Sequence, residues 1–217
     1  MKTDRELQQD VIDELSWAPD VDATEIGVTA KDGVVTLAGT VDSYAEKWAA
    51  EGAVKRLSGV KGLADELQVK LPGDSKRSDA DIARAAENAL EWDASVPEGI
   101  KVTVENGYVT LEGQVDWQYQ KEAAEDEVEC LTGVTGVDNE ITVKPSVPPA
   151  NIKAQIEAAF DRDAILCGDD IDVQVDGGTV TLSGRVDSWA ESDEAENDAW
   201  AAPGVCNVKN LISVASF

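Results

Sequence analysis

The side chains that most often perform chemistry in proteins are sparse or unpatterned in this sequence. The chain of 217 residues contains no histidine, which removes the commonest general base, the usual catalytic triads and most transition-metal sites. Carboxylates are so abundant, with 44 Asp and Glu, that any spacing between them arises by chance. No glycine motif of the phosphate-binding type is present. We therefore predict no catalytic residue, no cofactor and a protein that is not an enzyme.

One segment has the spacing of metal ligands. The run Asp169-Asp170-x-Asp172-x-Gln174-x-Asp176-Gly177 resembles the start of a calcium-binding loop. The residues between the acids, however, are Ile171, Val173 and Val175, which alternate as in a strand, and no glutamate occupies the twelfth position. We therefore predict a strand with acids on its solvent face, and no metal site.

Three cysteines, Cys130, Cys167 and Cys206, lie far apart and form no C-x-x-C pair. An odd number at wide spacing favours reduced thiols over a disulfide framework. A bridge between Cys167 and Cys206 stays open, because both fall in the same third of the chain.

Six tryptophans are the most informative large side chains. Trp17 and Trp92 end predicted helices, and we interpret them as packing residues. The other four are candidate interface residues, because half-exposed tryptophan is favoured where protein surfaces meet; they are Trp48, Trp117, Trp189 and Trp200. Local packing and contact between modules or with a partner stay equally open for these four.

The net charge of −26 disfavours partners that are themselves strongly negative. It repels nucleic-acid phosphates, and it opposes unassisted docking on an anionic membrane. No apolar run is long enough to span a bilayer, and the N-terminal residues lack the hydrophobic core of a signal peptide. The sequence thus predicts a cytoplasmic protein without a transmembrane segment, or a periplasmic one if a leader has been removed. The acidity itself indicates solubility or adaptation to high salt.

The elements that position these residues come in three copies. Val35–Asp42, Val109–Asp116 and Val180–Asp187 read VTLAGTVD, VTLEGQVD and VTLSGRVD, starting 74 and 71 residues apart. A second block, beginning Gly59-Val60, Gly133-Val134 and Gly204-Val205, repeats at the same offsets. Two blocks in constant register establish an internal repeat.

Each copy predicts the same order of elements. A helix is expected over about 3–17, 78–92 and 149–160, with Pro149 in the first turn of the third. An alternating strand follows, then an Asn-Gly or Asp-Gly turn, then the anchor as a second strand, which makes a hairpin. Asp42, Asp116 and Asp187 are expected to cap a second helix, with capping-box spacing at Ser43/Glu46 and Ser188/Glu191. A last strand ends near Val69, Val143 or Val214.

The predicted fold class is therefore α+β, with three tandem αββαβ modules, each a small three-stranded mixed sheet packed by two helices. The predicted modules are residues 1–73, 74–147 and 148–217. Glycines inside the anchor strand indicate a close approach, which we attribute to a helix over the strand, with ligand approach as the alternative; they are Gly39, Gly113 and Gly184.

The V-T-L-x-G-x-V anchor, together with the tail Gly133–Val143 or Gly204–Val214, resembles the BON domain of bacterial osmotically inducible and nodulation proteins. The first copy departs from that tail, with Asp65 where the others have Asn139 and Asn210. The resemblance implies a role in osmotic or envelope stress, interaction with phospholipid and no catalytic residues.

We accordingly expect a non-catalytic binding or stress-protection protein that offers three related surfaces to a protein partner. A phospholipid- or envelope-associated module is one alternative. A sensor of small ligands or cations is another, since the acidic field concentrates ions.

Overall fold

The computed structural model describes residues 2–145, 150–163, 165–166 and 170–214. Within these residues the chain forms three αββαβ modules, each with its own hydrophobic core. The predicted fold class is confirmed. Pro149, Cys167 and Asp169, for which the sequence made predictions, lie outside the described residues.

Module 1 contains two helices, a single 3-10 turn and a three-stranded sheet. In chain order these elements are α1 Asp4–Trp17, η1 Ala23–Glu25, β1 Ile26–Lys31, β2 Val34–Val41, α2 Tyr44–Lys55 and β3 Gly62–Val69. β1 pairs antiparallel with β2, and β2 pairs parallel with β3. The hairpin turn needs positive φ, which Asp32 at 54° and Gly33 at 84° supply.

Module 2 repeats this topology with an interrupted sheet. Its elements are α3 Asp79–Trp92, β4 Lys101–Glu105, β5 Tyr108–Glu112, β6 Gln114–Val115, α4 Gln118–Glu129, β7 Gly136–Asn139 and β8 Thr142–Val143. The strands pair as β4-β5-β7 and, beyond the interruption, as β6-β8.

Module 3 has the continuous sheet again. Its elements are α5 Ile152–Phe160, β9 Asp170–Asp176, β10 Thr179–Val186, α6 Trp189–Trp200 and β11 Asn207–Val214. β9 is the strand predicted from the calcium-like run, and its Asp172 and Asp176 are exposed.

Both helices of each module cover the same face of its sheet. In module 1, Leu7, Val11 and Leu15 lie on one stripe of α1 and pack on Val35 and Leu37 of β2. These five side chains are at most 2% exposed. The alternation that the anchor predicted therefore directs every second residue into the core.

The start of each second helix differs from the sequence prediction by one residue. The N-caps are Ser43, Trp117 and Ser188, rather than the preceding aspartates Asp42, Asp116 and Asp187. The Oγ atoms of Ser43 and Ser188 accept from the backbone N–H of Glu46 and Glu191, as the capping-box spacing predicted. The aspartates instead directly follow the anchor strand, and Asp42 donates its backbone N–H to the Glu46 carboxylate.

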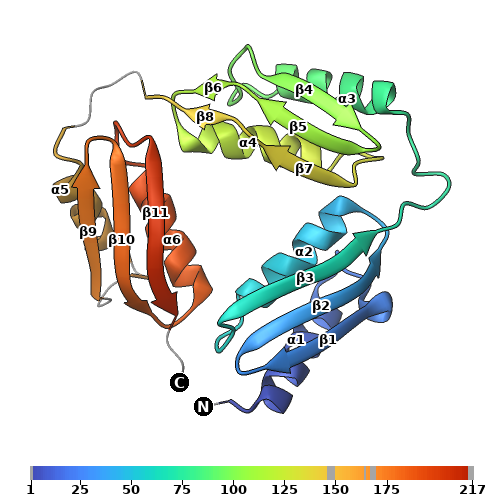
Figure 1. Cartoon of the computed structure of the whole chain (residues 1–217), viewed down its shortest axis with the longest axis horizontal. Helices are drawn as coiled ribbons and strands as arrows, with labels where there is room; N and C mark the ends of the chain where they lie inside the picture. The colour runs from blue at the N-terminus through green and yellow to red at the C-terminus, as the bar shows by residue number, and fades with distance from the viewer. Residues whose placement is uncertain (1, 146–149, 164, 167–169, 215–217) are drawn as a thin grey trace.

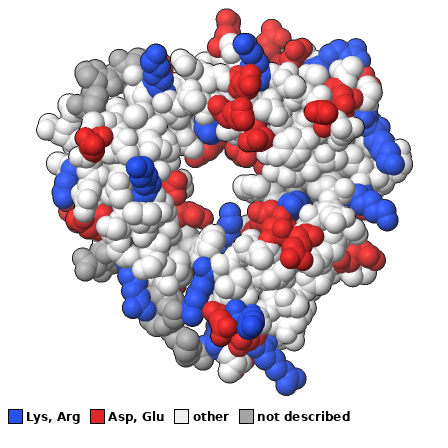
Figure 2. All heavy atoms as spheres, in the orientation of Figure 1, with Lys and Arg blue, Asp and Glu red and all other residues white. Residues whose placement is uncertain are grey.

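The three modules surround a common centre (Figure 1). Helices α2, α4 and α6 lie on the side nearer that centre, and α1, α3 and α5 lie nearer the rim. The space-filling view shows an opening between the modules, with acidic side chains along its edge (Figure 2). The extensive contacts between elements all lie within a module. Between modules, Tyr44 of α2 packs against the core of module 2.

Candidate functional site

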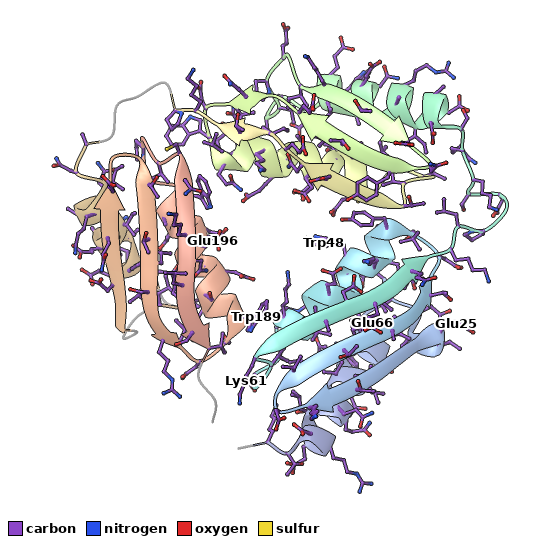
Figure 3. All side chains as sticks on the ribbon, viewed as in Figure 1. Glu25, Trp48, Lys61, Glu66, Trp189 and Glu196 are labelled. Carbon is purple, nitrogen blue, oxygen red and sulfur yellow. The ribbon has the colours of Figure 1, made fainter. Side chains whose placement is uncertain are left out.

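The four candidate interface tryptophans all lie on the inner helices or at their ends. Trp48 belongs to α2, Trp117 is the N-cap of α4, and Trp189 and Trp200 are the first and last residues of α6. Trp48 is 52% exposed, and the other three are half-buried. Figure 3 shows Trp48 on the side of α2 that faces the centre, and Trp189 on the side of module 3 next to module 1.

Two of these tryptophans line the seam between modules 2 and 3. A hollow of about 220 Å³ lies between α4 and α6; it is lined by Trp117, Gln118, Tyr119, Glu122, Asn197, Trp200 and Ala201. Trp200 also packs against the core of module 3. Trp200 therefore packs locally and also borders the hollow between the two modules.

A second hollow of about 220 Å³ lies at the seam between modules 3 and 1. It is lined by Trp48, Glu51, Gly52, Lys55 and Arg56 of module 1 and by Ala190 and Asp193 of module 3. Burial raises the pKa of the Asp193 carboxyl, and the nearby Lys55 opposes this by lowering it. The indole Nε1 of Trp189 is buried and has no hydrogen-bond partner among the described residues.

Sequence reasoning missed the aromatic residue at the third seam, Tyr44 at the start of α2. Tyr44 is half-buried and packs against the core of module 2. Burial, together with the negative charge of Glu125 of α4, raises the pKa of its hydroxyl to about 12. The available signal was its position, because Tyr44 and Trp189 both directly follow a capping serine in corresponding repeats.

The Tyr44 seam also holds a buried carboxylate. Glu129, in the last turn of α4, is 6% exposed, and its Oε2 has no hydrogen-bond partner among the described residues. Desolvation raises the pKa of Glu129 to about 7, helped by the negative charges of Asp126 and Glu125. A carboxyl group in this state titrates near neutral pH.

Trp17 and Trp92 are not packing residues, so that prediction was wrong. They are 84% and 88% exposed, at corresponding ends of α1 and α3. Each follows the last buried leucine of its helix, Leu15 or Leu90, by two positions. Two residues turn the helix by about 200°, which directs the indole away from the core.

The anchor glycines approach backbone rather than a helix. A Cβ on Gly39, whose φ is 141°, would overlap the carbonyl oxygen of Glu25, just before β1. Gly184 has a similar φ of 144°. A Cβ on Gly113 would meet the Ile100 Cα at 3.4 Å, an ordinary contact. At Gly39 and Gly113, the neighbour is therefore the chain segment that enters the first strand, and not the helix that the sequence predicted.

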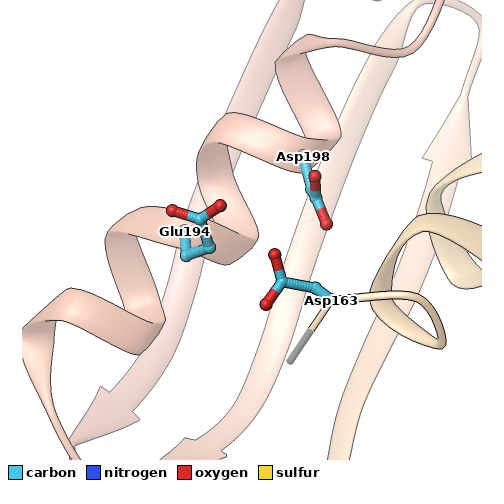
Figure 4. Close-up of side chains that lie close together, drawn as sticks. All are labelled: Asp163, Glu194 and Asp198. Carbon is cyan, nitrogen blue, oxygen red and sulfur yellow. The ribbon is translucent and has the colours of Figure 1, made fainter. Parts of the chain in front are cut away.

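One group of carboxylates could hold a cation, at a place that the sequence did not single out. Asp163 follows α5, and Glu194 and Asp198 lie on α6, with their oxygens within 4.8 Å of one another (Figure 4). Burial raises the pKa of both Glu194 and Asp198, and the charge of Asp163 adds to this. Asp163 Oδ1 already accepts from the backbone N–H groups of Ile165 and Leu166, which gives the carboxylate a structural role in the loop.

The described cysteines are surface thiols. Cys130 and Cys206 are exposed and free. Burial raises the pKa of the Cys130 thiol, and the neighbouring Glu129 adds to this. A raised pKa leaves less of the reactive thiolate at neutral pH.

Comparison with known proteins places the repeat in a family. The model of the BON domain matches residues 3–70, 78–145 and 149–216. The chain belongs to the BON domain family. The "Osmotically-inducible protein Y" of Escherichia coli (strain K12) is 33% identical over 129 residues. That match covers 57% of this chain and 64% of the relative's own length.

Among solved structures, two of the CdsD protein of the type III secretion system of Chlamydia trachomatis are similar. One is 17% identical, covering 95% of this chain and 91% of that chain, with a TM-score of 0.26. The other, the C-terminal domain, is 16% identical, covering 99% of this chain and 100% of that chain, with a TM-score of 0.27. At these scores neither structure supports an inference about this chain.

Proposed function

We propose that this BON protein is a non-catalytic binding protein of the osmotic-stress type, which contacts a partner protein through three related surfaces. The family and the similarity to an osmotically inducible protein support the stress-related role. We also propose that residues 1–73, 74–147 and 148–217 are the folding units that carry these surfaces.

The observation that carries the proposal is the uncovered face of each sheet. The side of the sheet opposite the helices has a half-buried threonine in the middle of its central strand: Thr36, Thr110 or Thr181. Flanking residues are small or polar, as in the rows Thr29–Thr36–Ala64 and Thr103–Thr110–Asp138.

The same faces each present one exposed large apolar side chain. These are Val34 on β2, Tyr108 on β5 and Leu211 on β11. Each alternates with core residues along its strand and therefore points away from the helices. A flat surface with a small centre and one apolar anchor suits a protein partner, and three copies on short linkers raise the overall affinity through multivalency.

The experiment compares two triple variants of the full chain. Thr36→Arg, Thr110→Arg and Thr181→Arg together place a long cation on every open face. The matched control, Gln9→Arg, Asn88→Arg and Gln155→Arg, adds the same charge to exposed helix positions in the three modules. We expect the sheet variant alone to lose the proteins that cross-link to the wild-type chain in osmotically stressed cells. Equal loss in both variants would contradict the proposal.

The phospholipid alternative is tested on the same proteins by flotation with vesicles of anionic and zwitterionic lipid. Flotation of the wild-type chain, lost in the sheet variant, would replace the protein partner by a membrane. No helix among the described residues is long and apolar enough to cross a bilayer. The cytoplasmic location and its periplasmic alternative stay predictions.

A further inference from the structure

A groove lies on module 2 at the end of α3, and it shares no lining residue with the hollows at the seams. It encloses about 300 Å³ and is lined by Glu87, Leu90, Glu91, Val96, Pro97, Glu98, Gly99 and Ile100. We call it the α3 groove. Its floor and its rim have different chemistry.

The floor of the α3 groove is an apolar edge of the module 2 core. Leu90 belongs to that core, and Val96 and Ile100 pack against it while half-exposed. The loop that carries Val96 and Pro97 is fixed by its own hydrogen bonds. The Ser95 N–H donates to Asp93 Oδ1 over 2.7 Å, and the Val96 N–H donates to the Asp93 carbonyl. The floor is therefore a formed surface that can receive apolar side chains without rearrangement.

The rim is acidic and carries no compensating charge. Glu87 and Glu91 stand four residues apart on α3, and Glu98 faces them from the loop; all three are exposed. Like charges at this spacing destabilise a helix. Among the described residues, none of these carboxylates forms an ion pair, and no lysine or arginine lines the groove.

Module 1 is built differently at the corresponding place. Ile12 and Ser16 occupy the helix positions of Glu87 and Glu91. The following segment forms the turn η1, and its Ala23 packs against the module 1 core. Module 3 has Glu157 and Asp161 at these positions, and Glu157 pairs with Lys153. The acidic rim without a paired cation therefore distinguishes module 2 from module 1.

We propose that the α3 groove binds a segment of a partner protein in which apolar side chains are flanked by lysine or arginine. Apolar side chains cover Leu90, Val96 and Ile100, while the cations approach the three rim carboxylates. A second hollow shares Pro97 with the groove; Asp116 and Gln120 line it together with one cation, Lys144. The two hollows together give an extended segment a track across module 2.

The probe is a labelled Lys-Lys-Leu-Leu-Lys-Lys peptide, and its affinity for the full chain is measured by fluorescence anisotropy at 0.1 M salt. The groove variant is Glu87→Gln, Glu91→Gln and Glu98→Gln. The matched control is Glu105→Gln, Glu112→Gln and Glu127→Gln, three exposed positions elsewhere in module 2 that change the net charge equally. The Lys-Lys-Ser-Ser-Lys-Lys peptide controls for the apolar contact.

We expect the groove variant to weaken binding of the leucine peptide roughly tenfold, and the control variant to weaken it less than about twofold. The serine peptide should bind the wild-type chain about tenfold more weakly than the leucine peptide. Equal loss in both variants, or equal affinity for both peptides, would show diffuse attraction to an acidic protein and overturn the proposal. Unchanged peptide binding, with loss of vesicle binding or self-association in the groove variant, would also overturn it.

Discussion

Modules 1 and 2 carry nearly the same anchor, VTLAGTVD and VTLEGQVD, but differ in backbone at its glycine. In module 1, Gly39 has a φ of 141° and lies within β2, which is unbroken over its eight residues, Val34–Val41. In module 2, Gly113 lies outside the left-handed region, and the sheet divides there into β5 with β7 and β6 with β8.

The difference arises in the chain segment that enters the first strand. In module 1 the Glu25 carbonyl occupies the space where a Gly39 Cβ would lie. In module 2 the residue before Ile100 is Gly99, which itself has a positive φ of 101°. The glycine with the positive φ is therefore Gly39, in the anchor strand, in module 1. In module 2 it is Gly99, in the segment that enters the first strand. An identical motif does not imply an identical role for its glycine.

Replacing the two glycines by valine should produce the largest difference. Gly39→Val combines a strained φ with a backbone overlap, so we expect the free energy of unfolding to fall by about 3 kcal/mol or more. Gly113→Val meets neither obstacle, because Gly113 has no positive φ and a Cβ there makes only ordinary contacts. With only ordinary contacts to Ile100 and Gly99, it should cost less than about 1.5 kcal/mol. Urea unfolding measures both, and a larger loss at Gly113 would contradict the comparison.

The second comparison concerns Glu129, whose counterpart in module 1 is Lys55. The folded-state pKa of Glu129 is raised to about 7. The stability that this raised pKa contributes is full below the unfolded pKa of about 4.3 and is lost as pH rises through about 7. Glu129→Gln should therefore stabilise the protein by about 1–3 kcal/mol at pH 8 and leave it unchanged near pH 4.

Thermal unfolding of Glu129→Gln across this pH range tests the prediction. Glu127→Gln is the control, because Glu127 is exposed on the same helix. A stabilisation that does not depend on pH, or that appears equally in the control, would show that Glu129 does not titrate as a buried group.

The third comparison concerns the polar residue that ties the last strand to the second helix. Asn139 donates from Nδ2 to the Lys121 carbonyl over 2.8 Å and to Glu125 Oε2 over 3.1 Å. In module 1 the same place holds Asp65, which pairs with Lys47. Asn139→Asp removes the donor and faces Glu125 with a second charge, so we expect a loss of about 1–2 kcal/mol.

The reverse exchange, Asp65→Asn, keeps the acceptor for the Leu67 N–H and loses only the partly exposed ion pair. It should cost less than about 1 kcal/mol. Denaturant unfolding of both variants decides the comparison. A larger cost for Asp65→Asn would indicate that the Asp65–Lys47 ion pair stabilises its module more than the Asn139 hydrogen bonds stabilise theirs.

The smallest expected effect is that of salt, and it should differ between seams. Burial raises the pKa of Glu122 in module 2, and the charge of Glu196 in module 3 adds to this across one seam. Across another seam, Lys55 of module 1 attracts Asp193 of module 3. The net charge of −26 and this repulsion predict that added salt compacts the particle and raises its melting temperature by a few degrees, mainly through modules 2 and 3. Scattering and thermal melts across a salt series measure both. A melting temperature that falls steadily would show that attractive pairs dominate.

The sequence by itself determined the repeat, the order of elements and most of their ends. Alternating and helical hydrophobic patterns are local, and turn and capping residues act within four positions, so each copy could be interpreted without its neighbours. The caps at Asp42, Asp116 and Asp187 were displaced by one residue, because the serine that follows two of them has the same capping chemistry.

Only the tertiary structure decided what surrounds each side chain. The exposure of Trp17 and Trp92, the Glu25 carbonyl beside Gly39, and the burial of Glu129 near Tyr44 depend on segments far apart in the chain. Such contacts carry no local sequence pattern, because they follow from how helices pack on a sheet and how modules meet. The α3 groove is of the same kind, since its floor comes from the core and its rim from a helix and a loop that the fold brings together.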